Sequence, residues 1–477
     1  MSLYLGNFIQ GHLFFYRLYK YCYINLKIIL ARVIVLSSDK TVQRSTVLKY
    51  VVPSIGAMLV TSLYVVVDGV FVGNGIGPEA LAAINIAGPF IMTIVALTMM
   101  VTVGGATMTA INIGKGNEES ANNYFNVSLK VIFLFSFIMT LISVLFPRQI
   151  VKVLGANEAL VESAACYLKY FVLFGIFFCS AMALSAFVRN DGSPKLAFWG
   201  MVSGGISNIF LDWLFIFPLN MGIKGSAIAS GLGQTLSCII LLTHFIRKKG
   251  VLRMKKSHMS KEIMGEICKR GTPEFMNQLF QPITVLCYNL IVIRIFGEIG
   301  VAAFSVVYYI LTISVSVFIG LTQGTQPLIS YSYGEGNKEN EKYFYHTGLL
   351  LNTILALIIY VLMFFFGEPV IRFFNSDPTL VNIGYDCIKI YGLSFIFTAI
   401  NIVIISYYTA KKQTGSALLL STIRCLIFIP LCVFITPLIF GEKAVWIGIS
   451  VAELFNLLLA VVIKIVNKRK SFDKKWC

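Results

Sequence analysis

Three carboxylates lie inside long apolar stretches of this 477-residue chain: Asp68, Asp212 and Glu453. A charge at membrane depth is costly, so an acid placed there indicates an ion or substrate site. At the helical rise, Asp68 lies about 30 Å from the start of its stretch at residue 48, and Asp212 lies about 26 Å from residue 195. When both stretches start at the same membrane face, the two acids reach a similar depth. Two adjoining carboxylates could hold a Na⁺ ion or share one proton near neutral pH.

Two further polar residues are expected at that depth. Asn208 stands one helical turn before Asp212 on the same helix face, and Ser230 lies about 10 Å into a stretch that runs in the opposite direction. We therefore predict a cation site formed by Asp68, Asn208, Asp212 and Ser230. The only metal ion expected is Na⁺, bound by Asp68, Asn208 and Asp212. In the alternative, Asn and Ser side chains satisfy each acid, or Asp68 ends its span near the lipid headgroups.

A second set of polar residues is a candidate for contacting a substrate. Glu453 lies near the middle of its stretch and could meet a cationic substrate, although a pair with Arg424 explains it equally well. Its approximate counterpart in the first half of the chain is Gln234. The full predicted substrate set is Gln234, Gln278, Gln281, Tyr308 and Glu453. Polar contacts between helices would leave the same pattern.

Glu274 directly follows Pro273 at the predicted start of a span. A carboxylate is favourable at the N-terminus of a helix, where the backbone dipole is positive. We therefore interpret Glu274 as an acid at a helix start.

The elements that carry these residues are apolar and long. The chain is 57% hydrophobic and 13% charged, whereas soluble proteins carry about 25% charged residues. About 20 apolar residues cross a bilayer. We predict an all-α polytopic membrane protein with about twelve spans, at 48–72, 83–110, 123–146, 165–188, 195–217, 223–246, 272–296, 300–331, 343–366, 384–409, 416–438 and 443–466.

The two halves of the chain are related. Residues 53–130 are repeated at 273–350, and Gly114-Lys-Gly-Asn117 returns as Gly334-Glu-Gly-Asn337. Six spans per copy is an even number, so both copies cross the membrane in the same direction. The repeats are then parallel, an arrangement typical of alternating-access transporters with a cleft between two halves.

This organisation divides the chain into five parts. They are an N-terminal extension (1–44), a first lobe (45–246), a basic cytoplasmic linker (247–270), a second lobe (271–466) and a cytoplasmic tail (467–477). Residues 1–36 are either an interfacial amphipathic segment or the product of an upstream start codon. Short surface helices are expected at 147–164 and 367–383. Glycine pairs at 104–105 and 204–205 are expected to allow close helix packing, with local bending of the helices as the alternative.

The net charge of +17 comes from basic residues in predicted loops. Basic loops stay on the cytoplasmic side of a membrane, so we expect both termini and the linker to be cytoplasmic, and no nucleic-acid partner. The ten cysteines form no CxxC pair and the four histidines show no ligand spacing, so no zinc site is expected. No GxxxxGK[ST] loop or catalytic cluster is present, which argues against an enzyme.

Several motifs resemble one transporter family. Val67-Asp-Gly-Val-Phe-Val-Gly73 is followed by Gly77-Pro-Glu-Ala-Leu-Ala-Ala83, and later by Arg189-Asn-Asp-Gly-Ser-Pro194, Asn208-Ile-Phe-Leu-Asp212 and Gly222-Ile-Lys-Gly-Ser-Ala-Ile-Ala-Ser230. In order and spacing these resemble signatures of the multidrug and toxic compound extrusion (MATE) family, over residues 45–466. The resemblance implies a V-shaped pair of six-helix lobes, monomeric in the cell membrane, that exports organic cations and drugs, including antibiotics, by Na⁺ or H⁺ antiport without another cofactor.

The resemblance also implies a site. An N-lobe cation site of the family maps onto Asp68, Asn208, Asp212 and Ser230, with Ser230 in place of the family's Thr. Some branches carry a carboxylate midway along the seventh helix, where this chain has Gln278-Leu-Phe-Gln281. This difference favours a branch that works through the N-lobe.

The nearest alternative function is a flippase for a lipid-linked saccharide. A pyrophosphate headgroup would need a large basic cavity, and the basic residues expected at membrane depth are few, namely Arg294 and Arg424. A membrane-embedded enzyme and a receptor or scaffold are the remaining alternatives.

Overall fold

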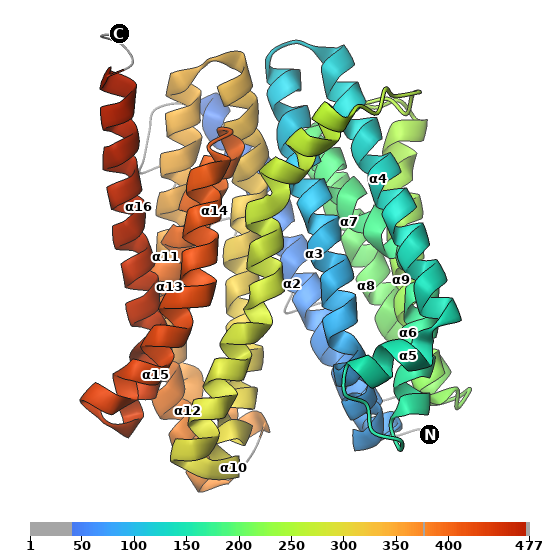
Figure 1. The fold of residues 1–477 in the computed structure, drawn as a ribbon, viewed down its shortest axis with the longest axis vertical. Coiled ribbons are helices and arrows are strands. Elements are labelled where there is room, and N and C mark those ends of the chain that lie inside the picture. Colours follow the sequence, from blue (N-terminus) through green and yellow to red (C-terminus); the bar gives the residue numbers. More distant parts are fainter. Residues whose placement is uncertain (1–40, 375–376, 474–477) are drawn as a thin grey trace.

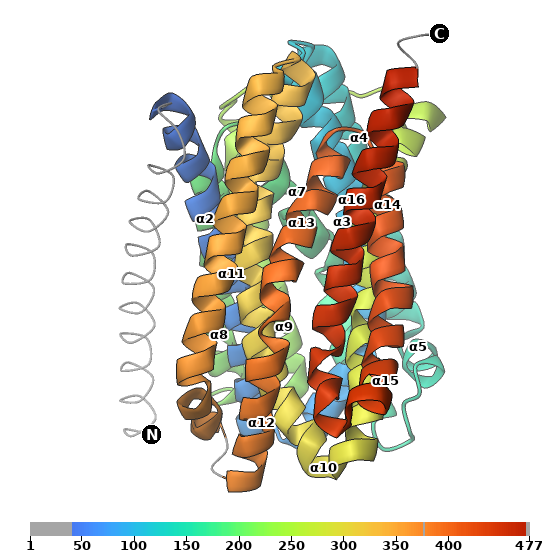
Figure 2. The same ribbon diagram turned by 90° about the vertical axis from the view of Figure 1, so that its left-hand side faces the viewer.

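The computed structural model describes residues 41–374 and 377–473, which form two helical lobes side by side (Figures 1 and 2). The first lobe contains α2 (Thr41–Gly75), α3 (Pro78–Gly114), α4 (Glu118–Leu145), α5 (Pro147–Val153), α6 (Val161–Leu173), α7 (Gly175–Asn190), α8 (Pro194–Ile216) and α9 (Gly222–Ile246). The second contains α10 (Lys261–Glu335), α11 (Lys338–Phe374), α12 (Pro378–Tyr391), α13 (Ser394–Ala410), α14 (Thr414–Ile423), η1 (Arg424–Phe428), α15 (Ile429–Phe440), η2 (Glu442–Ile447) and α16 (Gly448–Asp473). The predicted extension lies outside the described residues up to residue 40.

Each of the twelve predicted spans corresponds to helix in the described ranges. Eight helices there are individually long and apolar enough to cross a membrane, or up to ten when the bent pairs α6–α7 (52°) and α12–α13 (45°) each count as one. The long α10 supplies two spans, because its backbone breaks at Gly297, where φ is 66°. The fifth predicted span is α8. The all-α fold with twelve membrane helices in two lobes is therefore confirmed.

Of the two predicted surface helices, one is present in the described ranges and the other is not. The first is present as α5, although the second part of the predicted range already belongs to α6. The second is wrong, because α11 continues through Pro369 to Phe374 and α12 begins at Pro378. An ion pair between Glu368 and Arg372, one turn apart, lies across this stretch and supports its helical form.

Each lobe has its own hydrophobic core. In the first, Phe125 packs between Phe187 and Phe245, with ring centroids 5.0 and 4.8 Å away. In the second, Tyr288 stacks on Phe304 at 5.0 Å. The separation is incomplete at one end of the molecule, where residues of α2 join the second core and α10 contributes to the first.

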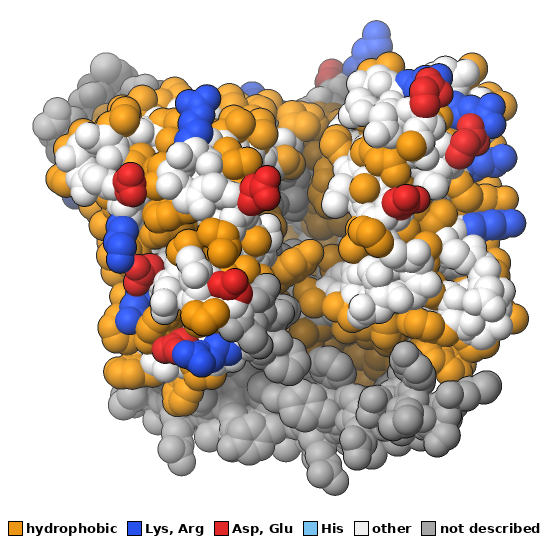
Figure 3. All heavy atoms as spheres, turned by 90° about the horizontal axis from the view of Figure 1, so that it is seen from below, with side chains coloured by type: hydrophobic (Ala, Val, Ile, Leu, Met, Phe, Trp, Pro, Cys, Tyr) orange, Lys and Arg blue, Asp and Glu red, His pale blue; other side chains and the backbone are white. Residues whose placement is uncertain are grey.

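At that end, which carries the linker, glycines let the helices of the two lobes touch backbone to backbone. A Cβ added to Gly104 of α3 would lie 3.0 Å from the Gly271 nitrogen of α10, and one added to Gly324 would lie 2.7 Å from the Val51 Cα of α2. Both α3 and α8 continue unbroken through their glycine pairs, so the packing interpretation of these pairs is confirmed. From the opposite end, Figure 3 shows a hollow between the two lobes.

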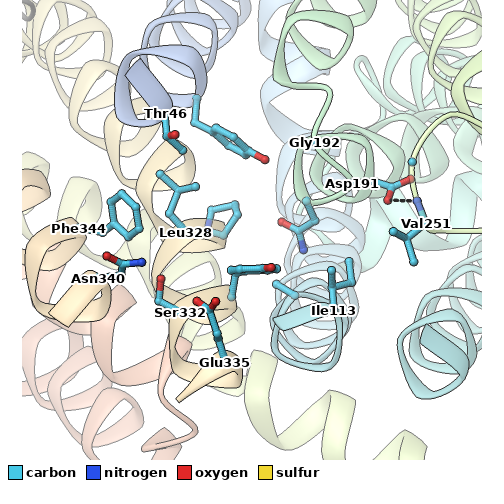
Figure 4. Close-up of a pocket in the computed structure, with 16 residues that line it drawn as sticks. Thr46, Ile113, Asp191, Gly192, Val251, Leu328, Ser332, Glu335, Asn340 and Phe344 are labelled. Carbon is cyan, nitrogen blue, oxygen red and sulfur yellow. Dashed lines mark hydrogen bonds between the residues drawn. The ribbon is translucent and has the colours of Figure 1, made fainter. Parts of the chain in front are cut away.

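Between the lobes at the linker end lies a cavity of about 370 Å³ (Figure 4). Asp191, in its wall, accepts hydrogen bonds from the backbone nitrogens of Val251 (2.7 Å) and Leu252 (3.2 Å) and lies 2.8 Å from the buried His244 ring. The cavity therefore borders the attachment of the linker.

The linker is docked on α4 along its length. Asn122 accepts a hydrogen bond from the Arg253 nitrogen at 2.5 Å, and Asn126 accepts one from the Lys255 nitrogen at 3.1 Å. The linker is thus attached to the first lobe. The last part of the predicted linker is helical, because α10 begins at Lys261, and Ile267 of α10 is buried in the first lobe's core.

Candidate functional site

The two acids of the first lobe lie next to each other, on α2 and α8. Asp68 accepts a hydrogen bond from the Ser226 hydroxyl of α9 at 3.1 Å. Asp212 is fully buried, and its carboxyl group lies close enough to the Asp68 carboxyl group for the two to interact electrostatically. Two carboxylates this close repel each other unless a proton or a cation lies between them.

The other two predicted residues complete a continuous polar cluster. Asn208 adjoins Asp212 and donates a hydrogen bond to the Ser230 hydroxyl at 3.2 Å. Among the described groups, no donor satisfies either oxygen of Asp212 or the side-chain oxygen of Asn208. Buried oxygens without donors are destabilising unless a ligand occupies them. These hard oxygen atoms fit Na⁺, and the adjoining carboxyl groups fit a shared proton.

Glycines of α8 bring the three helices close enough to form this cluster. A Cβ on Gly204 would lie 2.7 Å from the Gly233 carbonyl oxygen of α9, and one on Gly205 would lie 3.3 Å from Tyr64 of α2. Asn208 is one turn beyond Gly204 and Asp212 two turns beyond it, so the close packing that the glycines permit places both polar side chains between α2 and α9.

Two residues of the cluster were missed from the sequence. Ser226 lies one turn before Ser230, and Tyr64 one turn before Asp68, so each shares a helix face with a predicted residue. The Tyr64 hydroxyl accepts a hydrogen bond from Gln234 at 3.4 Å. This contact places Gln234, from the predicted substrate set, beside the cation cluster. The i, i+4 spacing was the signal that could have identified both.

In the second lobe, Glu453 of α16 is paired with Arg424. The Arg424 guanidinium donates to Glu453 Oε1 at 2.5 and 2.8 Å, and Asn401 of α13 donates to Oε2 at 2.7 Å. Glu453 has no exposed surface. The structure thus shows the alternative in which Glu453 pairs with Arg424. A contact between Glu453 and a substrate stays a prediction, and it would require this ion pair to separate.

The remaining predicted substrate residues lie near one another. Gln278 of α10 donates to Glu274 at 3.0 Å, whereas Gln281 is exposed and adjoins the Tyr308 hydroxyl. The interpretation of Glu274 as a helix-start acid is wrong. Because α10 begins at Lys261, Glu274 lies more than three turns inside the helix.

The second copy of the repeat lacks the acidic cluster. At the repeat spacing of 220 positions, Tyr288 corresponds to Asp68 and Cys432 to Asp212. Tyr288 is fully buried, and its hydroxyl accepts a hydrogen bond from the Ile449 nitrogen at 3.2 Å. Aromatic packing therefore replaces the carboxylates. Within the described ranges, no three His, Cys, Asp or Glu residues are grouped to hold a metal.

Comparisons with a family profile, with related sequences and with solved structures all point to the same family of membrane proteins. The sequence profile of the MatE family matches residues 53–214 and again 273–434, two ranges displaced by 220 positions. The Multidrug export protein MepA of Staphylococcus saprophyticus is 23% identical over 439 residues, which cover 91% of this chain and 97% of MepA.

Two solved structures share the fold. "Crystal structure of MATE in complex with MaL6" aligns with a TM-score of 0.84 at 22% identity, covering 91% of this chain and 97% of that one. "Outward-facing conformation of a multidrug resistance MATE family transporter of the MOP superfamily" aligns with a TM-score of 0.83 at 23% identity, covering 91% and 96%. The two profile matches together span more than half of the sequence, and this multi-pass membrane protein belongs to the MatE family.

Proposed function

We propose that this protein is a secondary active multidrug exporter that exchanges organic cations for Na⁺ or H⁺ through the cluster of Asp68, Asn208, Asp212 and Ser230. The observation that carries the proposal is the proximity of Asp68 and Asp212. Among the described groups, none donates a hydrogen bond to either side-chain oxygen of Asp212. Relatives named as multidrug export proteins support the export function. The coupling ion is the only cofactor proposed, and the protein acts as a transporter, not as an enzyme.

The orientation of the protein in the membrane is proposed from the distribution of its Lys and Arg residues. The linker and the turns at its end of the molecule are rich in Lys and Arg, including Arg247, Lys248 and Lys249. Basic segments stay in the cytoplasm, so the linker end and both termini are assigned to that side. The lobes touch at this end and leave a hollow at the other (Figure 3), which corresponds to an outward-facing state.

Helix α2 connects the ion cluster to the contact between the lobes. Its cytoplasmic half packs against the second lobe, where Val51 meets Gly324. Its outer half carries Asp68, about 26 Å away along the helix. Neutralising the two carboxylates removes their repulsion, which changes the packing of α2 against α8 and α9. An ion drives transport only through different affinities for the two states, and α2 is the element through which that difference reaches the interface.

No observation favours the flippase. A pyrophosphate headgroup requires unpaired positive charge in the cleft. Of the two basic residues expected at membrane depth, Arg424 is held by Glu453.

Ethidium efflux from cells under an imposed Na⁺ or pH gradient tests the proposal. Asp68→Asn and Asp212→Asn are each expected to reduce gradient-driven efflux by at least about tenfold, because each leaves one carboxyl group where the site needs two. Glu298→Gln, which changes an exposed acid at the far end of α10's first span, is the matched control. Unchanged coupling in both Asn variants would refute the site, and efflux that ignores both gradients would refute antiport.

A further inference from the structure

Glu274 is an acid inside a membrane span without a charged partner. Of the four carboxylates at such depth in the described ranges, Asp68 and Asp212 adjoin each other and Glu453 is paired with Arg424. Glu274 receives one hydrogen bond, from Gln278, and no described cation acts on it. Its carboxyl group therefore lacks a charged partner among the described residues.

The face of α10 that carries Glu274 points away from lipid. Exposed apolar residues mark the lipid-facing stripe of this span, at Leu279, Leu286, Leu290 and Ile293. Glu274 and Gln281, two turns apart, share a different face. Gln281 is exposed although it lies off the lipid stripe. An exposed amide on an inner face indicates a water-accessible cleft.

Glu274 also lies next to the point where the two lobes cross. Gly271, one turn before it, packs so closely on α3 that an added Cβ would lie 2.8 Å from the Met100 Cα. Beyond this crossing the lobes separate toward the hollow seen in Figure 3. Glu274, one turn beyond Gly271, therefore lies just past this crossing, on the side where the lobes separate.

The surroundings of Glu274 suit an organic cation better than a metal ion. A dehydrated Na⁺ needs several oxygen ligands, and here one carboxylate and one amide are present. A bulky cation with delocalised charge needs one opposite charge and apolar walls. Met100 and Met276, both partly buried and adjacent to this turn, provide adaptable apolar surface.

We propose that Glu274 binds the positive charge of the exported molecule at the base of the cleft and makes the transporter selective for organic cations over neutral and anionic molecules. This inference rests on the proposed export function. It separates the two charged ligands in space: the coupling ion binds at Asp68 and Asp212, and the substrate binds at Glu274.

Equilibrium binding of ethidium to the purified full-length protein, measured by fluorescence anisotropy, tests the proposal. Glu274→Gln is expected to weaken ethidium binding by at least about tenfold and to leave the binding of an uncharged dye of similar size unchanged. Glu274→Asp keeps the charge and is expected to retain most of the affinity. The double variant Glu274→Gln/Gln278→Glu moves the carboxylate one turn along the same face and is expected to recover binding.

Glu298→Gln, which changes an exposed acid outside both proposed sites, is the control and should bind ethidium as the unaltered protein does. Ethidium affinity that is unchanged in Glu274→Gln would overturn this inference while the export proposal stands. Equal loss of charged and uncharged dyes would show a structural role for Glu274 and also overturn it. Absence of ethidium binding and efflux in the unaltered protein would overturn both proposals.

Discussion

Carboxylates inside the membrane helices of this chain are found in three different environments. A carboxylate can lie beside a second acid, as Asp68 lies beside Asp212, or pair with a base, as Glu453 does with Arg424. It can also lack a charged partner, as Glu274 does among the described residues. The partner of each acid therefore indicates its function better than its depth does.

The pair of Arg424 and Glu453 gives a prediction at the residue scale. Glu453→Gln leaves the Arg424 guanidinium buried without a counter-charge and is expected to lower the free energy of unfolding by about 3–5 kcal/mol. Arg424→Met/Glu453→Leu removes both charges together and is expected to cost less. Thermal unfolding of the purified protein measures both, and a double variant no more stable than the single one would contradict the argument.

The individual acids and several of their polar neighbours were predictable, but the hydrogen bond from Ser226 was not. Asp68, Asp212 and Asn208 follow from burial cost and helical rise, which need only one helix at a time. Ser226 becomes a partner of Asp68 only when α9 docks on α2, a tertiary contact that the sequence does not encode locally. Glu274 was misinterpreted because α10 begins at Lys261, before its apolar part, so the helix start was placed too late.

At the scale of elements, glycine decides how closely helices approach. Gly204→Ala places a Cβ 2.7 Å from the Gly233 carbonyl oxygen, which forces α8 away from α9. We expect a loss of about 1–3 kcal/mol in the free energy of unfolding, together with weaker ion coupling, because Asn208 and Asp212 move with α8.

Gly265→Ala is the matched control for this change. Gly265 is also helical, but a Cβ there meets nothing within 4 Å. The substitution is expected to be neutral or to stabilise by up to about 1 kcal/mol. Thermal unfolding and gradient-driven efflux of the two variants are compared, and equal behaviour would show that close packing of α8 is not required.

At the scale of the whole molecule, the transport mechanism proposed above requires the lobes to separate at the linker end. Gln326 of α10 donates to Thr107 of α3 at 3.5 Å across this interface. In a background without native cysteines, oxidation of Thr107→Cys/Gln326→Cys is expected to abolish efflux, because it fixes the closed end. A reductant should restore efflux.

A cysteine pair within one lobe controls for the oxidation itself. Ser416 of α14 accepts a hydrogen bond from Asn467 of α16 at 3.2 Å inside the second lobe. Oxidised Ser416→Cys/Asn467→Cys should continue to transport. Efflux that persists after complete cross-linking of the interlobe pair would mean that these contacts do not open during the cycle.

The architecture was predictable at this scale because two signals are strong in the sequence. Hydropathy located the spans, and the repeat related the two halves, which the family profile matches separately. The docking of the linker on α4 was not predictable. It depends on Asn122 and Asn126, whose side chains bind the linker backbone and therefore leave no pattern in the linker's own residues.

The replacement of Asp68 and Asp212 by Tyr288 and Cys432 in the second copy has a thermodynamic consequence. Under the antiport proposed above, an acidic pair that binds one monovalent ion in each cycle would exchange it for one monovalent substrate. Such an exchange moves no net charge, so the membrane voltage does no work on it. The steepest substrate gradient that the protein can build then equals the concentration ratio of its coupling ion, whatever the electrical potential of the cell.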